Sequence, residues 1–399
     1  MTEVTSLAVW ADLDKAGILA REGRQQYIFA YAPDAVASSA VSLTMPVRLE
    51  SWVSRELHPV FQMNLPEGAL LEAIRRAIAK LVGDDDLSIL RVTGGNQIGR
   101  NRFSEIGAEH PAYDGARESL DEILAYPDTV ELFHELLDRY ALRSGISGAQ
   151  PKVLLDATER GTLTSAGYIL KTWGADYPQL AANEFFCMTA AQRAGLSVPD
   201  FHLSANGGLF VMRRFDLNLD GSSLGFEDMC SLQAQGTAQK YGGTYERIAR
   251  SLKDFISGED LVPARKQFFA MLVLSSMVKN GDAHLKNFGV LYSAPGGPVT
   301  MAPVYDVVTT TVYLRKDTPA LSLAGTKRWW ERKVLEHFAV THLNLPVGEI
   351  REIIERSAAA VMETREIIPG YIADHPEFKA IGGEMMLIWE EGVNSFRKG

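Results

Sequence analysis

The hydrophobic and polar positions in the first part of the chain predict a small sheet followed by a helix. Two strand-like segments, Ser6–Trp10 and Gln26–Tyr31, are separated by a polar, glycine-containing stretch that we expect to form a hairpin turn. Apolar residues then recur at spacings of three and four between Leu70 and Leu81, the pattern of an amphipathic helix. The stretch Glu105–Arg117 carries proline, glycine and polar residues and is typical of a connector.

The middle of the chain mixes helical and strand-like patterns. A helical pattern covers Leu120–Leu142 with a break at Pro127, and a second helix is expected over Pro178–Ala194 with Gly195 as its stop. Short strands are expected at Lys152–Leu155, Tyr168–Thr172 and Leu209–Arg213.

From about Cys230 onward the pattern becomes mostly helical. Strand candidates there are confined to Phe288–Tyr292 and a few residues near Met301. The helices are expected at Gly243–Ile256, Leu261–Asn280, Val347–Arg365 and Glu384–Arg397. A mixed half followed by a helical half predicts an α+β protein with two lobes and a cleft between them.

Composition and charge narrow the classes of protein that fit this pattern. The 399 residues include 40 Lys and Arg against 50 Asp and Glu, a formal net charge of −10, which argues against a protein that binds nucleic acid by itself. The longest nearly apolar run, Phe268–Val278, is shorter than the roughly 18 residues that span a bilayer. The two cysteines, Cys187 and Cys230, exclude a disulfide framework and a cysteine-based zinc site. Because the N-terminus also lacks a secretory pattern, we expect a cytoplasmic protein without a membrane segment.

The densest polar cluster follows the apolar helix that ends at Val278 and runs from Asn280 to Asn287. Phosphoryl transfer explains its spacing, because a carboxylate must accept the proton of the acceptor hydroxyl and a nearby amide oxygen must help to hold Mg²⁺. Asp282 and Asn287 are five residues apart, as are the Asp and Asn of the protein-kinase catalytic loop. Asp306, nineteen residues after Asn287, is placed as a second Mg²⁺ ligand.

Two other interpretations of this cluster remain open. Asp282 and Asn287 could belong to a structural loop with Asx turns. A two-metal phosphoesterase would use Asp282, His284 and Asp306, although the sequence places a single histidine nearby.

A kinase also needs a cation on a strand and a glycine-containing loop for the phosphates. Lys171 ends the apolar strand that begins at Tyr168, much like the V-A-I-K element of kinases. It could also be a lysine that extends to solvent at a strand end. Glu184, on the next helix, could pair with Lys171 or be a solvated glutamate. The loop candidate is Ser144–Lys152, whose backbone N–H groups can bind anions, with a plain hairpin turn as the alternative.

Taken together, these residues resemble the HipA family of type II toxin–antitoxin serine/threonine kinases. The first 104 residues look like the HipA N-terminal subdomain, and the motifs follow in family order over roughly residues 140 to 315. The motifs are Ser147–Lys152, Tyr168–Lys171, Asn183–Glu184, Leu196–Pro199, Met212–Asp216, Glu227–Cys230, Asn280–Phe288 and Ala302–Thr309. The resemblance implies a bilobed, protein-kinase-like α+β fold with an N-terminal subdomain (1–104), the remainder of the N-lobe (105–229) and a helical C-lobe (230–399).

The resemblance also implies ATP and Mg²⁺ as cofactors and assigns roles to residues. Asp282 would be the general base, His284 and Lys286 would support the catalytic loop, and Asn287 and Asp306 would bind Mg²⁺. ATP would be held by the phosphate loop, the strand lysine and a hinge that meets the adenine, namely by Ser147, Gly148, Ala149, Gln150, Lys152, Lys171, Glu227, Asp228 and Met229.

Further implications of the resemblance concern regulation and partners. Family members autophosphorylate a serine of the phosphate loop, and because the usual position is Gly145 here, Ser147 and then Ser144 are the candidates. The family phosphorylates aminoacyl-tRNA synthetases and pairs with a small HipB-like helix-turn-helix antitoxin. An acidic chain would therefore reach operator DNA indirectly, through that antitoxin. The basic segment Lys327–Lys333, with two tryptophans, is either a helix face with buried indoles or a contact for a partner or DNA.

Two functions of other kinds are kept as alternatives. Aminoglycoside and choline kinases share a G-D-x-H-x-x-N loop, so a small-molecule phosphotransferase is the nearest enzyme, although the segments Ser147–Lys152 and Glu227–Cys230 argue against it. A catalytically silent corepressor that docks an antitoxin is the other. The presence of all four predicted catalytic residues argues against this corepressor, because a protein without kinase activity need not retain them. They are Lys171, Asp282, Asn287 and Asp306.

Overall fold

The computed structural model describes residues 4–23, 26–78, 85–111, 118–140, 150, 152–158, 165–218 and 220–397. The chain forms two compact units. Unit 1 comprises Met1–Thr172, Val211–Thr237 and Val290–Pro298, and unit 2 comprises Trp173–Phe210, Ala238–Gly289 and Val299–Gly399. Each unit is therefore assembled from segments that are distant in the sequence. The division into 1–104, 105–229 and 230–399 stays a prediction.

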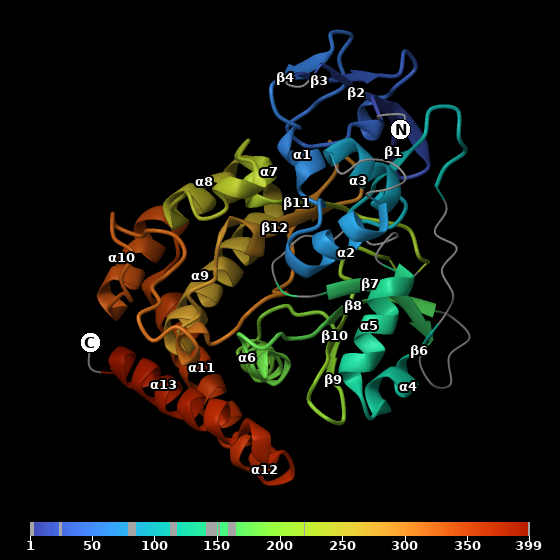
Figure 1. The fold of residues 1–399 in the computed structure, drawn as a ribbon. Coiled ribbons are helices and arrows are strands. Elements are labelled where there is room, and N and C mark those ends of the chain that lie inside the picture. Colours follow the sequence, from blue (N-terminus) through green and yellow to red (C-terminus); the bar gives the residue numbers. More distant parts are fainter. Residues whose placement is uncertain are drawn as a thin grey trace. The chain divides into compact units, whose positions relative to one another are not determined.

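Unit 1 begins with an antiparallel sheet in the strand order β4-β3-β2-β1-β5 (Figure 1). Its strands are β1 (Ser6–Ala11), β2 (Asp14–Glu22), β3 (Gln26–Tyr31), β4 (Trp52–Ser54) and β5 (Asn101–Ser104). The predicted hairpin turn between the first two segments is wrong, because β2 occupies that stretch. Because this segment has polar ends and a central glycine, its sequence lacks the regular alternation of a strand. Its Ala16 and Leu19 are nevertheless buried. Gly17 is required there, since a Cβ would lie 2.2 Å from the Ala30 carbonyl oxygen on β3.

Aromatic rings form much of the hydrophobic core that packs against this sheet. Phe61 lies between Phe29 and Phe103, with ring centroids 5.3 and 5.8 Å away and both pairs edge to face. The helices of this region are α1 (Pro59–Gln62), α2 (Gly68–Ile78) and α3 (Asp86–Thr93). The predicted helix at Leu70–Leu81 is confirmed as far as the end of α2, and residues 79–84 lie outside the described residues.

A second sheet of unit 1 contains β6 (Glu118–Ser119), β7 (Lys152–Thr158), β8 (Ser165–Lys171) and β10 (Phe210–Arg213) as neighbours in this order. The predicted helical break at Pro127 is confirmed, because α4 (Leu120–Ala125) and α5 (Thr129–Tyr140) flank it. The apolar side of α5 packs on β7. Unit 1 also holds β11 (Gly225–Asp228), most of β12 (Gly289–Tyr292) and the short helix α7 (Met229–Leu232).

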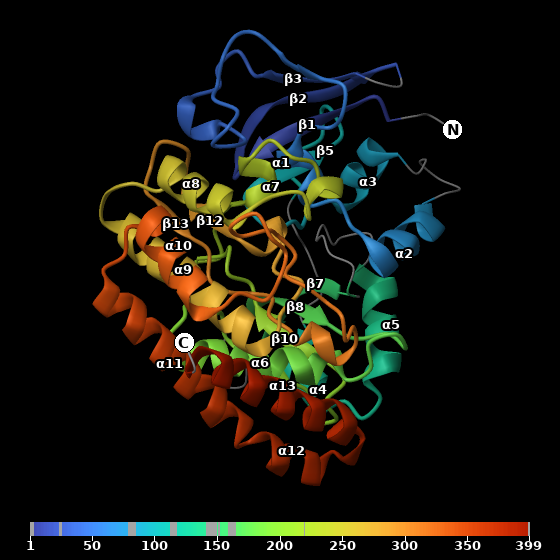
Figure 2. The same cartoon turned by 90° about the vertical axis from the view of Figure 1, so that its left-hand side faces the viewer.

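Unit 2 is built around α9 (Leu261–Val278), which contacts α6, α8, α10, α11 and α13 (Figures 1 and 2). These helices are α6 (Leu180–Arg193), α8 (Tyr245–Phe255), α10 (Arg332–Leu343), α11 (Val347–Arg365) and α13 (Lys379–Arg397), with α12 (Ile368–Asp374) before the last. Its short strands are β9 (Phe201–Leu203) and β13 (Val299–Met301). The helices predicted for this half are therefore confirmed, with α10 and α12 in addition.

The apolar character of α9 reflects its central position. With the turn before it, Gly258–Val278 is long and apolar enough to cross a membrane by length and composition alone. However, 67% of the most apolar window is buried inside the protein, as expected for the core helix of a globular unit. The thiols Cys187 and Cys230 are both buried and unbridged.

Candidate functional site

The polar loop after α9 is held in shape by its own backbone and by Asn280. The N–H groups of Lys279, a left-handed residue with φ 56°, and of Asn280 both donate to the Ser275 carbonyl. The Asp282 N–H donates to Oδ1 of Asn280 (3.1 Å), and Nδ2 of Asn287 donates to the Asp282 carbonyl (2.9 Å). The interpretation as a structural loop predicts an Asx turn, and the Asn280 side chain forms one with the Asp282 N–H. The carboxyl group of Asp282 takes no part in this turn.

The segment that carries Asp306 is positioned by a buried polar network in unit 2. Oδ1 of Asn183, on α6, accepts the Thr309 N–H (2.9 Å), and its Nδ2 donates to the Thr309 carbonyl (3.1 Å). The Thr309 hydroxyl accepts a hydrogen bond from Nε1 of Trp389 (2.8 Å), and all three residues are fully buried. Because a satisfied buried network has one arrangement, it defines the position of the backbone that follows Asp306. The adjacent Glu184 is also fully buried, so its interpretation as a solvated glutamate is wrong.

Gly281 allows the catalytic loop and the segment after Asp306 to approach each other. Its N–H donates to the Thr310 hydroxyl (2.8 Å), and that hydroxyl also lies within hydrogen-bond distance of the Asp317 carboxylate. A Cβ at position 281 would lie 2.0 Å from Oδ2 of Asp317. A side chain at this point of the loop would therefore displace the Asp317 carboxylate from its contact with Thr310.

The Asp282 carboxyl group is the predicted proton acceptor of this loop. Its side chain is 44% exposed, and the Tyr241 hydroxyl donates to Oδ1 at 2.8 Å. Desolvation, followed by the negative charge of Asp306, raises the pKa of Asp282 to about 6, while the Tyr241 hydrogen bond and the charge of Lys240 act in the lowering direction. A carboxyl group with this pKa is mostly ionised at neutral pH and can accept a proton.

The two predicted supporting residues contribute in different ways. Nε2 of His284 is 3.9 Å from Oδ1 of Asp282, too far for a hydrogen bond. Burial, followed by the charge of Lys240, lowers the pKa of His284 to about 4, so the imidazole is neutral at physiological pH. The carbonyl of Lys286 accepts a hydrogen bond from the Tyr305 hydroxyl, which links the loop to the residue before Asp306.

Asn287 and Asp306 suit a Mg²⁺ ion that takes its other ligands from phosphates and water. The hydrogen bond from Asn287 to the Asp282 carbonyl uses the side-chain nitrogen of Asn287. The side-chain oxygen, which is the atom that would bind a cation, takes no part in this bond. Among the described residues, no group of three or more His, Cys, Asp and Glu side chains could hold a metal ion. A site with few protein oxygen ligands fits Mg²⁺, which takes its other ligands from phosphates and water. A two-metal phosphoesterase would need more ligating side chains, so the described residues do not support that interpretation.

In unit 1, the two lysines predicted to bind phosphates are cross-strand partners. Lys152 begins β7 and Lys171 ends β8, and they are paired in the antiparallel register. Both are buried, with 6% and 3% exposure, so the interpretation of Lys171 as a lysine extended to solvent is wrong. Nε2 of Gln150 donates to the Thr172 carbonyl (3.2 Å) beside this pair. The remaining phosphate-loop candidates, Ser144, Ser147, Gly148 and Ala149, lie outside the described residues.

The predicted hinge begins with a fully buried carboxylate. Glu227 accepts hydrogen bonds from the Leu43 N–H (2.7 Å) and from three hydroxyl groups. These belong to Ser42 (2.7 Å), Tyr292 (2.8 Å) and Ser231 (3.1 Å). Burial nevertheless raises its pKa. Asp228 caps α7 by accepting the Ser231 N–H (2.9 Å). The side chains of Glu227 and Asp228 thus hold the backbone in place, and any contact with adenine falls to the backbone.

The sequence does not predict Tyr241, whose hydroxyl donates to Asp282 from 41 residues away in the chain. Nothing in its local sequence sets it apart from other loop tyrosines. The first of the two interpretations of Lys327–Lys333, a helix face, is wrong for most of the segment, because α10 begins at Arg332 and the preceding residues are irregular. The second, a contact for a partner or DNA, stays a prediction. Trp330 is buried there against the Tyr245 ring, at 5.3 Å between centroids.

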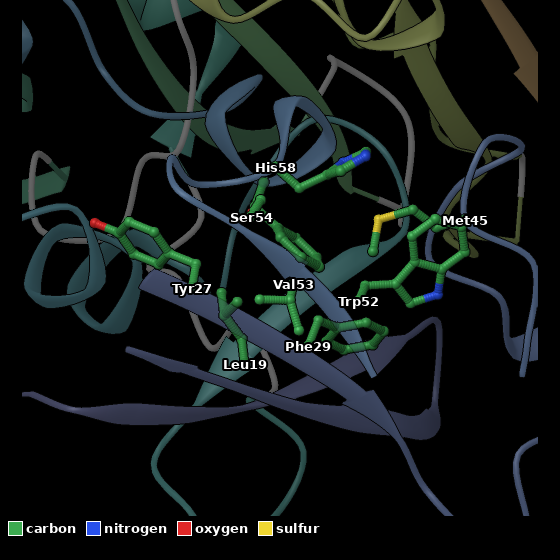
Figure 3. Close-up of a pocket in the computed structure, with 9 residues that line it drawn as sticks. Leu19, Tyr27, Phe29, Met45, Trp52, Val53, Ser54 and His58 are labelled. Carbon is green, nitrogen blue, oxygen red and sulfur yellow. The ribbon is translucent and has the colours of Figure 1, made fainter. Parts of the chain in front are cut away.

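A separate pocket of about 40 Å³ lies on the first sheet of unit 1 (Figure 3). Figure 3 shows Trp52 and Met45 at one end of it and Tyr27 at the other. Aromatic and apolar residues dominate its lining, which consists of Leu19, Tyr27, Phe29, Met45, Trp52, Val53, Ser54, His58 and Phe61. Burial lowers the pKa of His58 to about 4, so the pocket carries no imidazolium charge at neutral pH.

Comparison with known proteins gives two family matches and several relatives. Residues 7–104 match the HipA N-terminal domain, and residues 144–365 match the HipA-like C-terminal domain. "Putative kinase Y4mE" of Sinorhizobium fredii is 30% identical over an alignment of length 338 that covers 78% of this chain and 78% of that protein. "Putative kinase Y4dM" of the same organism is 28% identical over an alignment of length 258 that covers 57% of this chain and 62% of that protein, so the match spans less than two thirds of that protein.

A solved structure extends the likeness to nearly the whole chain. The Shewanella oneidensis toxin–antitoxin complex of HipA, HipB and operator DNA contains a chain with a TM-score of 0.73 and 18% identity, covering 98% of this chain and 97% of that one. The predicted protein-kinase-like α+β fold of HipA proteins is thereby confirmed. Since the C-terminal family model alone matches more than half of the residues, the chain belongs to the HipA family.

Proposed function

We propose that this chain is the toxin of a type II toxin–antitoxin pair and acts as an ATP- and Mg²⁺-dependent serine/threonine-protein kinase. The observation that carries the proposal is the arrangement around Asp282. Its ionisable carboxyl group is close enough to Asp306 for the two charges to interact, and its backbone is hydrogen-bonded to Asn287. The names of the curated relatives, which are given as kinases, support the same conclusion.

In the proposed reaction each residue has one task. Asp282 accepts the proton of the acceptor hydroxyl as the oxygen attacks the γ-phosphorus of ATP, and the bond from that phosphorus to the β,γ-bridging oxygen breaks to release ADP. Asn287 and Asp306 would hold Mg²⁺, which neutralises phosphate charge when bound. Lys152 and Lys171 bind phosphate oxygens, and Gln150 stabilises the end of β8 next to them. The backbone of Glu227–Met229 meets the adenine, while His284 and Lys286 support the loop.

The partners follow from the family assignment. The solved HipA structure is a complex with HipB and operator DNA. We propose that this chain binds a HipB-like helix-turn-helix antitoxin, reaches operator DNA through it and acts in the cytoplasm. The protein substrate is an aminoacyl-tRNA synthetase, whose phosphorylation halts growth, and autophosphorylation at Ser147 or Ser144 inhibits the kinase.

The test is phosphoryl transfer from radiolabelled ATP by the purified full chain, with Mg²⁺ and a whole-cell lysate. We expect label on a lysate protein as phosphoserine or phosphothreonine, and we expect mass spectrometry of that protein to identify a synthetase. Asp282→Asn should abolish labelling, and EDTA should do the same. Asp254→Asn, an exposed aspartate of α8 in the same unit, is the matched control and should keep full activity.

The same experiment separates the alternatives. Label on a small molecule other than ATP and inorganic phosphate, with none on protein, would identify a small-molecule phosphotransferase and refute the protein-kinase proposal. If neither the chain nor any lysate component gains label, while the chain still binds an antitoxin and strengthens its binding to operator DNA, the chain is a corepressor without kinase activity.

A further inference from the structure

The hydroxyl group of Tyr241 lies where the acceptor hydroxyl of a phosphoryl-transfer reaction has to be. It donates to Oδ1 of Asp282 at 2.8 Å. A general base must be within about 2.6–3.2 Å of the oxygen whose proton it removes. The phenol side chain is also 47% exposed, so the position that it occupies can be reached from solvent.

The backbone around Tyr241 is anchored on both sides of the residue. The Lys240 carbonyl accepts the N–H of Leu285 from the catalytic loop (3.1 Å). The Tyr241 carbonyl accepts a hydrogen bond from Nζ of Lys327 (3.1 Å), and the same ammonium group donates to the Ala320 carbonyl (2.7 Å). The phenol can therefore leave Asp282 by rotation about its side-chain bonds, without movement of the loop.

The surroundings of the ring mark a defined position beside the base. The ring packs edge-on against the neutral imidazole of His284, with centroids 5.1 Å apart and an interplanar angle of 77°. The ammonium group of Lys240 lies 5.6 Å from the ring centroid. An incoming side chain that reaches Asp282 would thus contact His284 and Lys240 in place of the phenol.

We propose that Tyr241 fills the acceptor subsite of the catalytic loop, so that a substrate hydroxyl must displace the phenol from Asp282 before transfer. This inference rests on the proposed kinase function and adds to it a residue that determines access to the base. The ligand of the subsite is a hydroxyl group, carried by a serine or threonine side chain or, without a protein substrate, by water.

The contact has a second explanation with the opposite consequence. If Tyr241 served to orient the Asp282 carboxylate, removal of its hydroxyl would impair the base and slow the reaction. If it occupies the acceptor position, removal of the hydroxyl abolishes the competition and strengthens acceptor binding. The sign of the change in KM and kcat therefore decides between the two.

The test compares the full chain with Tyr241→Phe, which keeps the ring and loses the hydroxyl. Dephosphorylated casein and water serve as the acceptors, the latter through basal ATP hydrolysis, at pH 8 where Asp282 is ionised. We expect the KM for casein to fall roughly fivefold and basal ATP hydrolysis to rise by a similar factor, as the loss of one competing hydrogen bond implies. Tyr177→Phe, another partly exposed tyrosine of unit 2, is the control and should change neither quantity.

The possible failures are distinguishable. If the unmodified chain transfers phosphoryl groups and Tyr241→Phe raises the KM or lowers kcat at pH 8, the inference is overturned and the kinase function stands. If the KM for casein and basal hydrolysis are unchanged in Tyr241→Phe, the phenol does not compete for the subsite, and the inference is likewise overturned. If the unmodified chain neither hydrolyses ATP nor phosphorylates any protein, the proposed function fails, and the inference falls with it.

Discussion

Lys152 and Lys171 lie directly opposite each other on the antiparallel strands β7 and β8. Side chains at such positions are on the same face of the sheet, with Cβ atoms about 4.5–5.5 Å apart. Both lysines are buried, so their positive charges are held in a medium that screens them less than water does. The phosphates of a nucleotide bound on this face would bring negative charge to both lysines.

We expect Lys171→Met to weaken nucleotide binding, because the substitution keeps the length of the side chain and removes its charge. Kd for ATP, measured by titration calorimetry, should rise roughly tenfold or more, as for the loss of a charge-assisted phosphate contact. Lys152→Met should act in the same direction, and the double variant should lose less than the sum of both effects, since the lysines share one ligand. Unchanged ATP binding in both single variants would contradict the assignment. Lys253→Met on the exposed side of α8 is the control.

The pH profile of the reaction should report the Asp282 carboxyl group. Its pKa is raised to about 6, and only the ionised form accepts a proton, so kcat/KM should decline as the pH falls through about 6. Below pH 5 the decline should approach tenfold per pH unit. Steady-state kinetics between pH 4.5 and 8.5 would show it, and a profile that is flat down to pH 5 would exclude Asp282 as the base.

Asp282→Asn should inactivate the protein and stabilise its fold. The folded state binds this proton more tightly than the unfolded state, whose aspartate has the ordinary pKa of 3.8, so the free energy of unfolding attributable to this group decreases as the pH rises from about 4 to about 6. At pH 7 the uncharged amide of the variant avoids the free-energy cost of holding an ionised carboxylate at this position. We expect a gain of about 1 kcal/mol, less than the full shift implies because the side chain is partly exposed to screening solvent.

Urea unfolding at pH 7 and at pH 4 measures this gain. The difference between Asp282→Asn and the unmodified chain should be present at pH 7 and nearly absent at pH 4, where the carboxyl group is protonated in the folded state. A variant that is less stable than the parent at pH 7 would refute the expectation.

Glu227→Gln should destabilise the protein by about 2–4 kcal/mol, because an amide N–H₂ would face hydrogen-bond donors where two carboxylate oxygens now accept. The donors are the Leu43 N–H and the hydroxyl groups of Ser42, Ser231 and Tyr292. Chemical denaturation followed by tryptophan fluorescence is the measurement. Glu50→Gln, at an exposed position of unit 1, should change stability by less than about 0.5 kcal/mol. Equal effects of both variants would show that the buried network contributes nothing.

Gly281→Ala tests the close approach between the catalytic loop and Asp317. The added Cβ would lie 2.0 Å from Oδ2 of Asp317, so that carboxylate must move and lose its contact with Thr310. We expect kcat to fall roughly tenfold, since small displacements of a catalytic loop are costly, with a small change in Tm. Gly348→Ala, where an added Cβ meets nothing within 4 Å, should leave kcat unchanged.

The comparison of sequence and structure shows which features a local pattern can predict. The continuous apolar stretch predicted α9, because a helix surrounded by other helices is apolar on all sides. The spacing of Asp282, Asn287 and Asp306 predicts that they share one site, because the three residues lie close together in the sequence. In contrast, β2 was missed because its alternation is interrupted by a glycine that a neighbouring strand requires. Tyr241 could not have been found, because its contact with Asp282 depends on the folding of unit 2 and on no local pattern.

The segmented construction of unit 1 has a consequence for synthesis. Glu227 obtains its donors from Ser42 near the N-terminus and from Tyr292, which follows the catalytic loop in the sequence. On the ribosome the buried acid therefore lacks one of its partners until Asp282 and Asn287 have already been translated. A nascent chain arrested before Tyr292 would carry a partly solvated carboxylate inside an incomplete unit. Such fragments are expected to be unstable targets for proteolysis, so that only chains extended beyond Tyr292 can complete the fold of unit 1.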